Sequence, residues 1–113
     1  MTCYERTVEN VLVLTLKGKL LTSDDTDVLY NHLNTVIERN IKHLVIDLRN
    51  VTMMSSLGIG SLMKSMITVR EADGDLRLTG LSEKVKDLFS ITKLIGVMKI
   101  FDSVNEAVKS FKD

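Results

Sequence analysis

A change of apolar periodicity between residues 43 and 72 constrains the fold of this chain more than any other feature of the sequence. Residues 43–48 (HLVIDL) form a short run of β-branched and leucine side chains, which is typical of a buried strand. From Ile59 onwards, apolar side chains recur every three or four residues, which predicts an amphipathic helix that ends near Ala72. A buried strand followed closely by an amphipathic helix indicates an α/β architecture.

The turn between this strand and this helix contains two serines and two glycines, Ser55, Ser56, Gly58 and Gly60. Serine is a preferred helix N-cap because its oxygen accepts a hydrogen bond from a free backbone N–H of the first turn, and ordinary capping is the simplest explanation of the pattern. The positive end of a helix also suits an added phosphate. Each glycine costs about 1 kcal/mol of helix propensity relative to alanine, so we expect close backbone approach or a small open surface here.

Short apolar runs, capping residues and glycines predict the remaining elements. In chain order we expect an edge strand at 2–9, a turn at Asn10, a strand at 11–16 ended at Gly18, a helix from 22–25 to about Asn40, the strand 43–48, the helix up to Ala72, a turn at 73–75, a strand at 76–79, a helix capped by Ser82, a strand at 98–101 and a helix capped by Ser103.

The predicted fold class is α/β, a single domain over residues 1–113 with a mixed four- to five-stranded sheet and about four helices in the order β-β-α-β-α-β-α-β-α. Strands that alternate with helices require right-handed parallel crossovers. The opening hairpin adds an antiparallel edge, and we expect strand 43–48 to be central.

Charge and cysteine content exclude several classes of function. Fifteen basic and fifteen acidic residues give a formal net charge of zero, so no long-range attraction to nucleic acid or to an anionic membrane is expected. The single cysteine, Cys3, excludes an intrachain disulfide and a multi-cysteine metal site. The sequence has no apolar run long enough for a membrane helix and no signal-peptide core. We expect a cytoplasmic domain without membrane insertion or direct nucleic-acid binding.

Catalytic and cofactor chemistry finds little support in the sequence. His32 and His43 fall in separate predicted elements without other ligands at metal-binding spacing, so both are interpreted as surface histidines. No candidate base is near Ser56 for serine catalysis. The Gly58-Ile59-Gly60 pattern lacks the third glycine of a dinucleotide loop. We therefore predict no catalytic residues, no metal and no cofactor, and a protein that is not an enzyme.

The run VTMMSSLGIG at residues 51–60 resembles the signature of the STAS domain of bacterial anti-sigma factor antagonists, which usually reads V-[ST]-[FY]-M-D-S-[ST]-G-[LI]-G. The predicted order of strands and helices is also that of the STAS fold. Two further stretches, LRLTGLSEKVKDLFSIT at residues 76–92 and DSVNEA at 102–107, are similar to the family's later motifs. The resemblance therefore covers nearly the whole chain.

The resemblance implies a regulatory binding module in transcription control. In the family, the first serine of the motif is phosphorylated by a partner anti-sigma factor with serine-kinase activity, and it falls on Ser56. Docking of the unmodified domain frees the sigma factor, phosphate switches docking off, and a serine phosphatase restores it. The implied partner-binding residues are those of the turn and first helical turn: Met54, Ser55, Ser56, Leu57, Gly58, Ile59, Gly60 and Ser61.

The sequence departs from the family pattern at the turn and near the second strand. Ser55 stands where the family has aspartate, and Leu57 stands where it has a small hydroxylated residue. Residues 18–21 read GKLL in place of G-E-[LI]-D, without either carboxylate. Phosphorylation could therefore move to Ser55, or be lost while the binding surface persists. Leu57 could contact the partner or pack locally as a hydrophobic staple.

Two alternative functions remain, of which the altered motif supports the first. One is a phosphorylation-independent STAS subunit of another regulatory or transporter assembly. The other is a small-ligand or nucleotide-binding domain. The methionines near the turn, Met53, Met54, Met63 and Met66, are most simply core residues, although some could form an adaptable partner surface.

Overall fold

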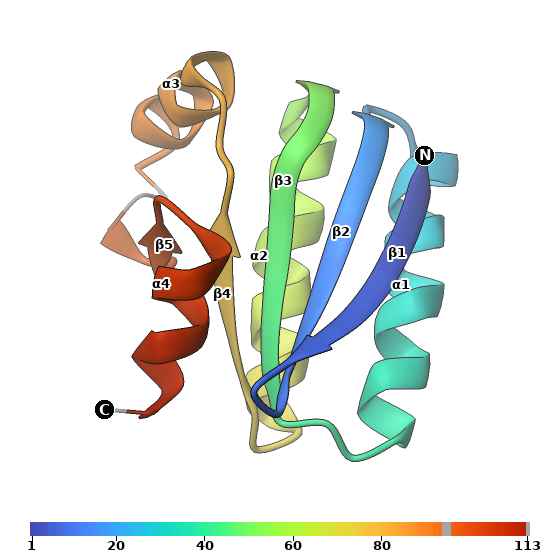
Figure 1. Ribbon diagram of the computed structural model, residues 1–113. Helices are drawn as coiled ribbons and strands as arrows, with labels where there is room; N and C mark the ends of the chain where they lie inside the picture. Colours follow the sequence, from blue (N-terminus) through green and yellow to red (C-terminus); the bar gives the residue numbers. More distant parts are fainter. Residues whose placement is uncertain (94–95, 113) are drawn as a thin grey trace.

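The computed structural model describes residues 1–93 and 96–112 (Figure 1). Its elements are β1 (Thr2–Val8), β2 (Val11–Leu20), α1 (Ser23–Glu38), β3 (His43–Met54), α2 (Ser56–Glu71), β4 (Asp75–Thr79), α3 (Glu83–Ile91), β5 (Ile100–Phe101), α4 (Val104–Lys109) and a final 3₁₀ turn (Ser110–Lys112). This is the predicted order of strands and helices. Within the described ranges, none of the helices combines the length and the apolar character needed to span a bilayer.

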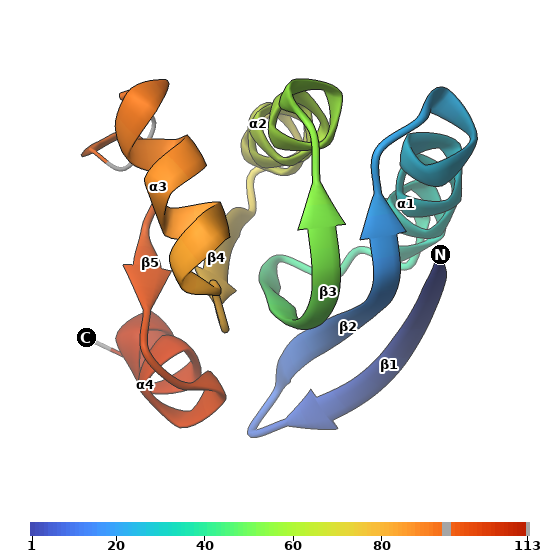
Figure 2. The same ribbon diagram turned by 90° about the horizontal axis from the view of Figure 1, so that it is seen from above.

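The five strands form one mixed sheet in the order β1-β2-β3-β4-β5. β1 pairs antiparallel with β2, and the other neighbours pair in parallel, so the predicted opening hairpin and the central position of β3 are confirmed. Seen from above, α1, α2 and α3 cover one face of the sheet and α4 lies on the other face (Figure 2). The carboxyl ends of β2 to β5 consequently meet at one edge.

Two apolar clusters hold these layers together. The larger cluster lies between the sheet and the three helices and includes Leu14, Ile46 and Leu62, which are fully buried. The smaller cluster lies under α4, where Ala107 and Val108 pack with valines of β2 and β3. Burying a side chain the size of leucine contributes about 1.5–3 kcal/mol, so the larger cluster supplies most of the stabilisation that positions β3 and α2.

Three predicted boundaries differ from the structure. β2 does not end at Gly18 but continues to Leu20, because the glycine adopts a positive φ of 113° and the register with β3 shifts on either side of it. β3 extends to Met54, since its second half pairs with this added part of β2. The predicted last strand, residues 98–101, is only Ile100–Phe101.

Candidate functional site

The strand-to-helix turn is a single residue, Ser55, which separates Met54 of β3 from Ser56 of α2. The Ser55 hydroxyl accepts a hydrogen bond from the Gly58 N–H (3.3 Å) and donates one to the Leu21 carbonyl (2.9 Å). The Ser55 N–H also donates to the Leu20 carbonyl at 3.2 Å. Ser55 is therefore the N-cap of α2, and it fixes the turn to the segment that joins β2 to α1.

Ser56 is the first residue of α2 and is exposed to solvent. Its hydroxyl forms no hydrogen bond with any residue that the structure describes. The first turn of α2 contains no acidic side chain, so the positive end of the helix is not neutralised by its own residues. The arrangement presents a free hydroxyl at a point that favours negative charge.

The two glycines of the turn have different reasons to be glycine. A Cβ on Gly58 would lie 2.3 Å from the Leu20 carbonyl oxygen and 2.8 Å from Cγ of Met54, so this position requires close approach of α2 to β2. A Cβ on Gly60 would have no atom within 4 Å. The sequence left close backbone approach and an open surface as alternatives. The structure shows close approach at Gly58 and an open surface at Gly60.

Only part of the predicted partner-binding stretch is exposed to solvent. Ser56, Leu57 and Gly60 are exposed, and Ser55 is half-buried. The other four members are buried: Met54, Gly58, Ile59 and Ser61. Met54 and Ile59 belong to the larger apolar cluster, and partner binding by this stretch stays a prediction.

Two apolar side chains beside the turn are open to solvent. Leu57 is 49% exposed, so it does not pack as a staple against its own helix. Met53 is 51% exposed, whereas Met66 is buried and Met63 is half-buried, so Met53 is the one methionine of this group that adds to the surface. Exposed leucine and methionine next to a free serine form a small apolar patch on the surface.

A groove adjoins Met53 on the side of α3. It has a volume of about 190 Å³, and α3 contributes Lys84, Val85 and Leu88 to its walls opposite Thr52, Met53 and Met54. The residues of α3 were not among the predicted site residues. The local pattern could not indicate them, because about thirty residues separate the two walls and only the packing of α3 brings them together.

The replaced GELD motif changes the charge beside the turn. Lys19 is exposed and pairs with Met53 in the sheet, while Leu20 is buried and Leu21 is half-buried. The Leu21 N–H donates to Asp25 Oδ2 (3.0 Å), and the backbone N–H groups of Leu21 and Thr22 lower the pKa of this carboxyl. Asp25 closes the capping box of α1 with Thr22 and is thereby turned toward its own helix.

The histidines and the cysteine lie away from the serine turn in local structural roles. His32 Nε2 lies 2.6 Å from Glu5 Oε1, and the His43 ring stacks on Phe111 with centroids 4.5 Å apart. Burial raises the pKa of the Cys3 thiol to about 11, so little reactive thiolate exists near neutral pH. Over the described part of the chain, no group of three or more His, Cys, Asp or Glu side chains could hold a metal ion.

The fold and the turn define a class: a small mixed α/β module whose central strand leads directly into a helix that begins with an exposed serine. The STAS domain family matches residues 5–107. The chain belongs to the STAS domain family.

Relatives with established names point to one branch of this family. The anti-sigma F factor antagonist of Paenibacillus polymyxa is 24% identical over 94 residues, which cover 82% of this chain and 80% of that protein. An anti-sigma factor antagonist from Mycobacterium paratuberculosis has the same fold, with a TM-score of 0.87 at 18% identity over 99% of this chain and 94% of that one.

Two further kinds of solved structure share the fold. The Bacillus cell fate determinant SpoIIAA in its phosphorylated form has a TM-score of 0.71 at 17% identity, covering 97% of this chain and 99% of that one. A sulfate transporter family protein from Wolinella succinogenes has a TM-score of 0.79 at 20% identity, covering 95% and 88%. The chain is therefore a STAS domain of the type found in anti-sigma factor antagonists, on a fold that also occurs in transporter proteins.

Proposed function

We propose that this protein is an anti-sigma factor antagonist that acts by binding in the cytoplasm and has no catalytic activity of its own. Its partner is an anti-sigma factor with serine-kinase activity, which docks on the turn at residues 54–61 and on the exposed face of α2. Phosphorylation of Ser56 switches docking off, and a serine phosphatase restores it. The observation that carries this proposal is the exposed, unbonded hydroxyl of Ser56 at the positive end of α2.

The geometry favours Ser56 over Ser55 as the acceptor of phosphate. The Ser55 hydroxyl donates its hydrogen to the Leu21 carbonyl and caps α2. Phosphorylation would remove that hydrogen and place a charged group against a carbonyl oxygen, which opposes modification of Ser55. A phosphate on Ser56 would break no hydrogen bond with the described residues and would be stabilised by the helix dipole.

The switch follows from electrostatics at an apolar contact. Phosphate adds about −1.5 to −2 charge near neutral pH. In the unmodified state, Leu57, Met53 and the groove along α3 offer an apolar surface with lysines at its rim. A doubly charged group in the middle of such a surface would lose its hydration on docking without gaining a partner. Docking is therefore lost although the fold is unchanged.

A kinase assay tests the acceptor. The purified protein is incubated with ATP and a cognate anti-sigma factor kinase, and the product is mapped by mass spectrometry. We expect one phosphate on Ser56 in the wild type and none in Ser56→Ala. Modification confined to Ser55, or none with a kinase that is active on another substrate, would show that Ser56 does not have this role.

A second candidate function is a phosphorylation-independent subunit of another regulatory or transporter assembly. Ser55 at the position of the family's aspartate favours this alternative, and so does the shared fold with a sulfate transporter family protein. The two functions differ in one measurement. A phosphorylation-independent subunit would bind its partner equally well as wild type and as Ser56→Asp.

A further inference from the structure

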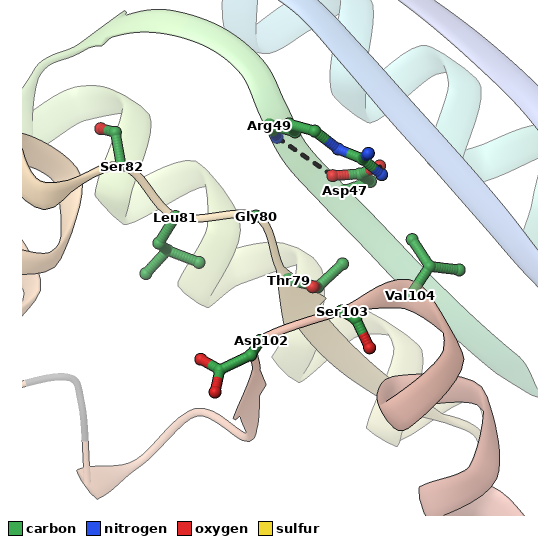
Figure 3. Close-up of a pocket in the computed structure, with 9 residues that line it drawn as sticks. All are labelled: Asp47, Arg49, Thr79, Gly80, Leu81, Ser82, Asp102, Ser103 and Val104. Atoms are coloured by element: carbon green, nitrogen blue, oxygen red, sulfur yellow. Dashed lines mark hydrogen bonds and ion pairs between the residues drawn. The ribbon is translucent and has the colours of Figure 1, made fainter.

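A cavity of about 400 Å³ lies at the carboxyl end of β4, beside the middle of β3, on the face of the sheet that α4 partly covers (Figure 3). β3 contributes Asp47 and Arg49 to its walls, and the segment after β4 contributes Gly80 and Ser82. The serine turn lies on the opposite, helix-covered side of β3. Crevices at the carboxyl ends of parallel strands are the usual ligand sites of open α/β sheets, and this one has no part in the docking proposed above.

The Thr79 side chain is a buried polar group in the wall of the cavity. Thr79 is only 1% exposed, and its hydroxyl forms no hydrogen bond with the residues that the structure describes. In the same part of the chain, no completely enclosed side-chain oxygen or nitrogen lacks a partner. The Thr79 hydroxyl must therefore be accessible from the cavity. Figure 3 shows Thr79 between Arg49 and Ser103. A buried hydroxyl without a protein partner is free to bind a ligand.

The wall beside Thr79 is held by close backbone contacts. The Asp47 carboxylate, 3% exposed, accepts hydrogen bonds from the Arg49 N–H (3.0 Å) and from its guanidinium group (3.0 Å). Gly80 has a positive φ of 77°, and a Cβ there would lie 2.6 Å from Arg49 N and 2.6 Å from Asp47 Oδ1. Any larger residue would push these walls apart, so the cavity has a defined shape at this point.

One cationic group in the cavity wall is available to an anion, the guanidinium of Arg49. Arg49 neutralises Asp47 with one nitrogen, and its remaining N–H donors are exposed. The Asp102 carboxylate points away from Arg49 in Figure 3. Ser82 caps α3 at the rim and brings the start of that nine-residue helix to the cavity, where Glu83 in the first turn offsets part of the positive charge of the helix end.

We propose that this cavity binds the carboxylate or phosphate group of a small organic anion. Thr79 donates its hydroxyl hydrogen to the anion, and Arg49 pairs with it from the open side. The size of the cavity suits a ligand of metabolite dimensions rather than a protein side chain. This site is independent of the phosphorylation of Ser56.

Solution NMR tests the site with two probes, inorganic phosphate and acetate, titrated at constant ionic strength into the ¹⁵N-labelled protein. We expect saturable shifts at the amides of Arg49, Leu81 and Ser82 with at least one probe, and the stronger probe identifies which anion the site prefers. Thr79→Val should weaken this binding about tenfold, because it removes the donor without changing the shape. Thr79→Ser should retain it.

Matched variants separate a site from a general effect of charge. Thr7→Val, an exposed threonine on β1, should leave the affinity unchanged. Arg49→Gln should weaken binding, with a thermal melt to show that the variant is folded. Shifts that rise linearly without saturation for both probes, or an unchanged affinity in folded Thr79→Val, would overturn the proposal. Saturable shifts confined to Ser56 and the first turn of α2 would equally assign the anion to the serine turn.

Discussion

Adjacent serines at the start of α2 have different surroundings and should respond differently to the same substitution. Ser55 is half-buried and uses both its donor and its acceptor within the turn. Ser56 is exposed and uses neither with the described residues. The motif alone could not make this distinction, because either serine can cap a helix and only the path of β2 shows which hydroxyl is engaged.

Alanine substitution at each serine measures this difference. Ser55→Ala should lower the free energy of unfolding by about 0.5–2 kcal/mol, because it removes the cap of α2. Ser56→Ala should change it by less than about 0.5 kcal/mol, as for an exposed position without a structural role. Urea denaturation followed by circular dichroism gives both values. A larger loss for Ser56→Ala than for Ser55→Ala would mean that the cap is misassigned.

Charge at position 56 should affect binding and not folding. Ser56→Asp should melt within a few degrees of the wild type, because its carboxylate suits the positive end of α2. The same charge, desolvated against the partner, should cost several kcal/mol and weaken affinity tenfold or more. Titration calorimetry with the purified anti-sigma factor measures the affinity, with Ser56→Ala as the control that should bind like the wild type. Wild-type affinity in folded Ser56→Asp would rule out the switch.

The two glycines of the turn offer a matched pair. Gly58→Ala should destabilise the protein by about 1–3 kcal/mol, since the new methyl group would overlap the Leu20 carbonyl. Gly60→Ala should be neutral or stabilise by up to about 1 kcal/mol, because the site is helical and open. Thermal melts of both variants test this pair. Equal effects would mean that α2 does not approach β2 as closely as described.

Among the elements, helices were predicted more accurately than strands. Thr22, Ser82 and Ser103 cap α1, α3 and α4, because a capping side chain acts on the backbone within three residues and leaves a local signal. The continuation of β2 beyond Gly18 depends instead on its pairing with β3. The site follows the same rule: Ser56 was predicted from its motif, while Lys84 and Leu88 reach it through the packing of α3.

An ion-pair cluster joins the end of α2 to the start of β4, and it makes the stability of the protein depend on pH. Burial alone would raise the pKa of Asp75, but the Arg77 guanidinium, the Leu76 N–H and the Arg70 guanidinium together hold it well below its usual range. Arg77 continues the cluster to α4, where it bonds Ser110 Oγ (2.9 Å) and lies over Phe111. Asp75 thus connects elements on both faces of the sheet.

A lowered pKa in the folded state means that this stabilisation is fully present above the unfolded value, near pH 4, and is lost as the pH falls toward the folded value. We therefore expect the wild type to lose stability over this acid range as Asp75 is protonated. Asp75→Asn should be less stable at neutral pH and should show a smaller loss on acidification. Denaturant titrations between neutral and acid pH test both statements. An identical pH dependence in the two proteins would contradict the role of Asp75.

At the scale of the whole molecule, the parallel strands gather both candidate sites at one edge of a domain that measures 30 × 27 × 23 Å. The serine turn leads into α2 on the helix-covered side of β3, and the cavity beside Thr79 lies on the other side. The two sites share β3 but no residue. One small domain can therefore present a protein-docking surface and a small-molecule site without competition between their occupants.

The lysine beside the serine turn has a consequence for any cell that contains several domains of this kind. Lys19 pairs with Met53 at the edge of the docking surface, where the family pattern has a carboxylate. A partner matched to that carboxylate would bring a positive group against Lys19, and like charges in a desolvated contact cost several kcal/mol. Parallel signalling routes built on the same fold would thus be insulated from one another, and a single charge reversal would suffice to separate a duplicated pair.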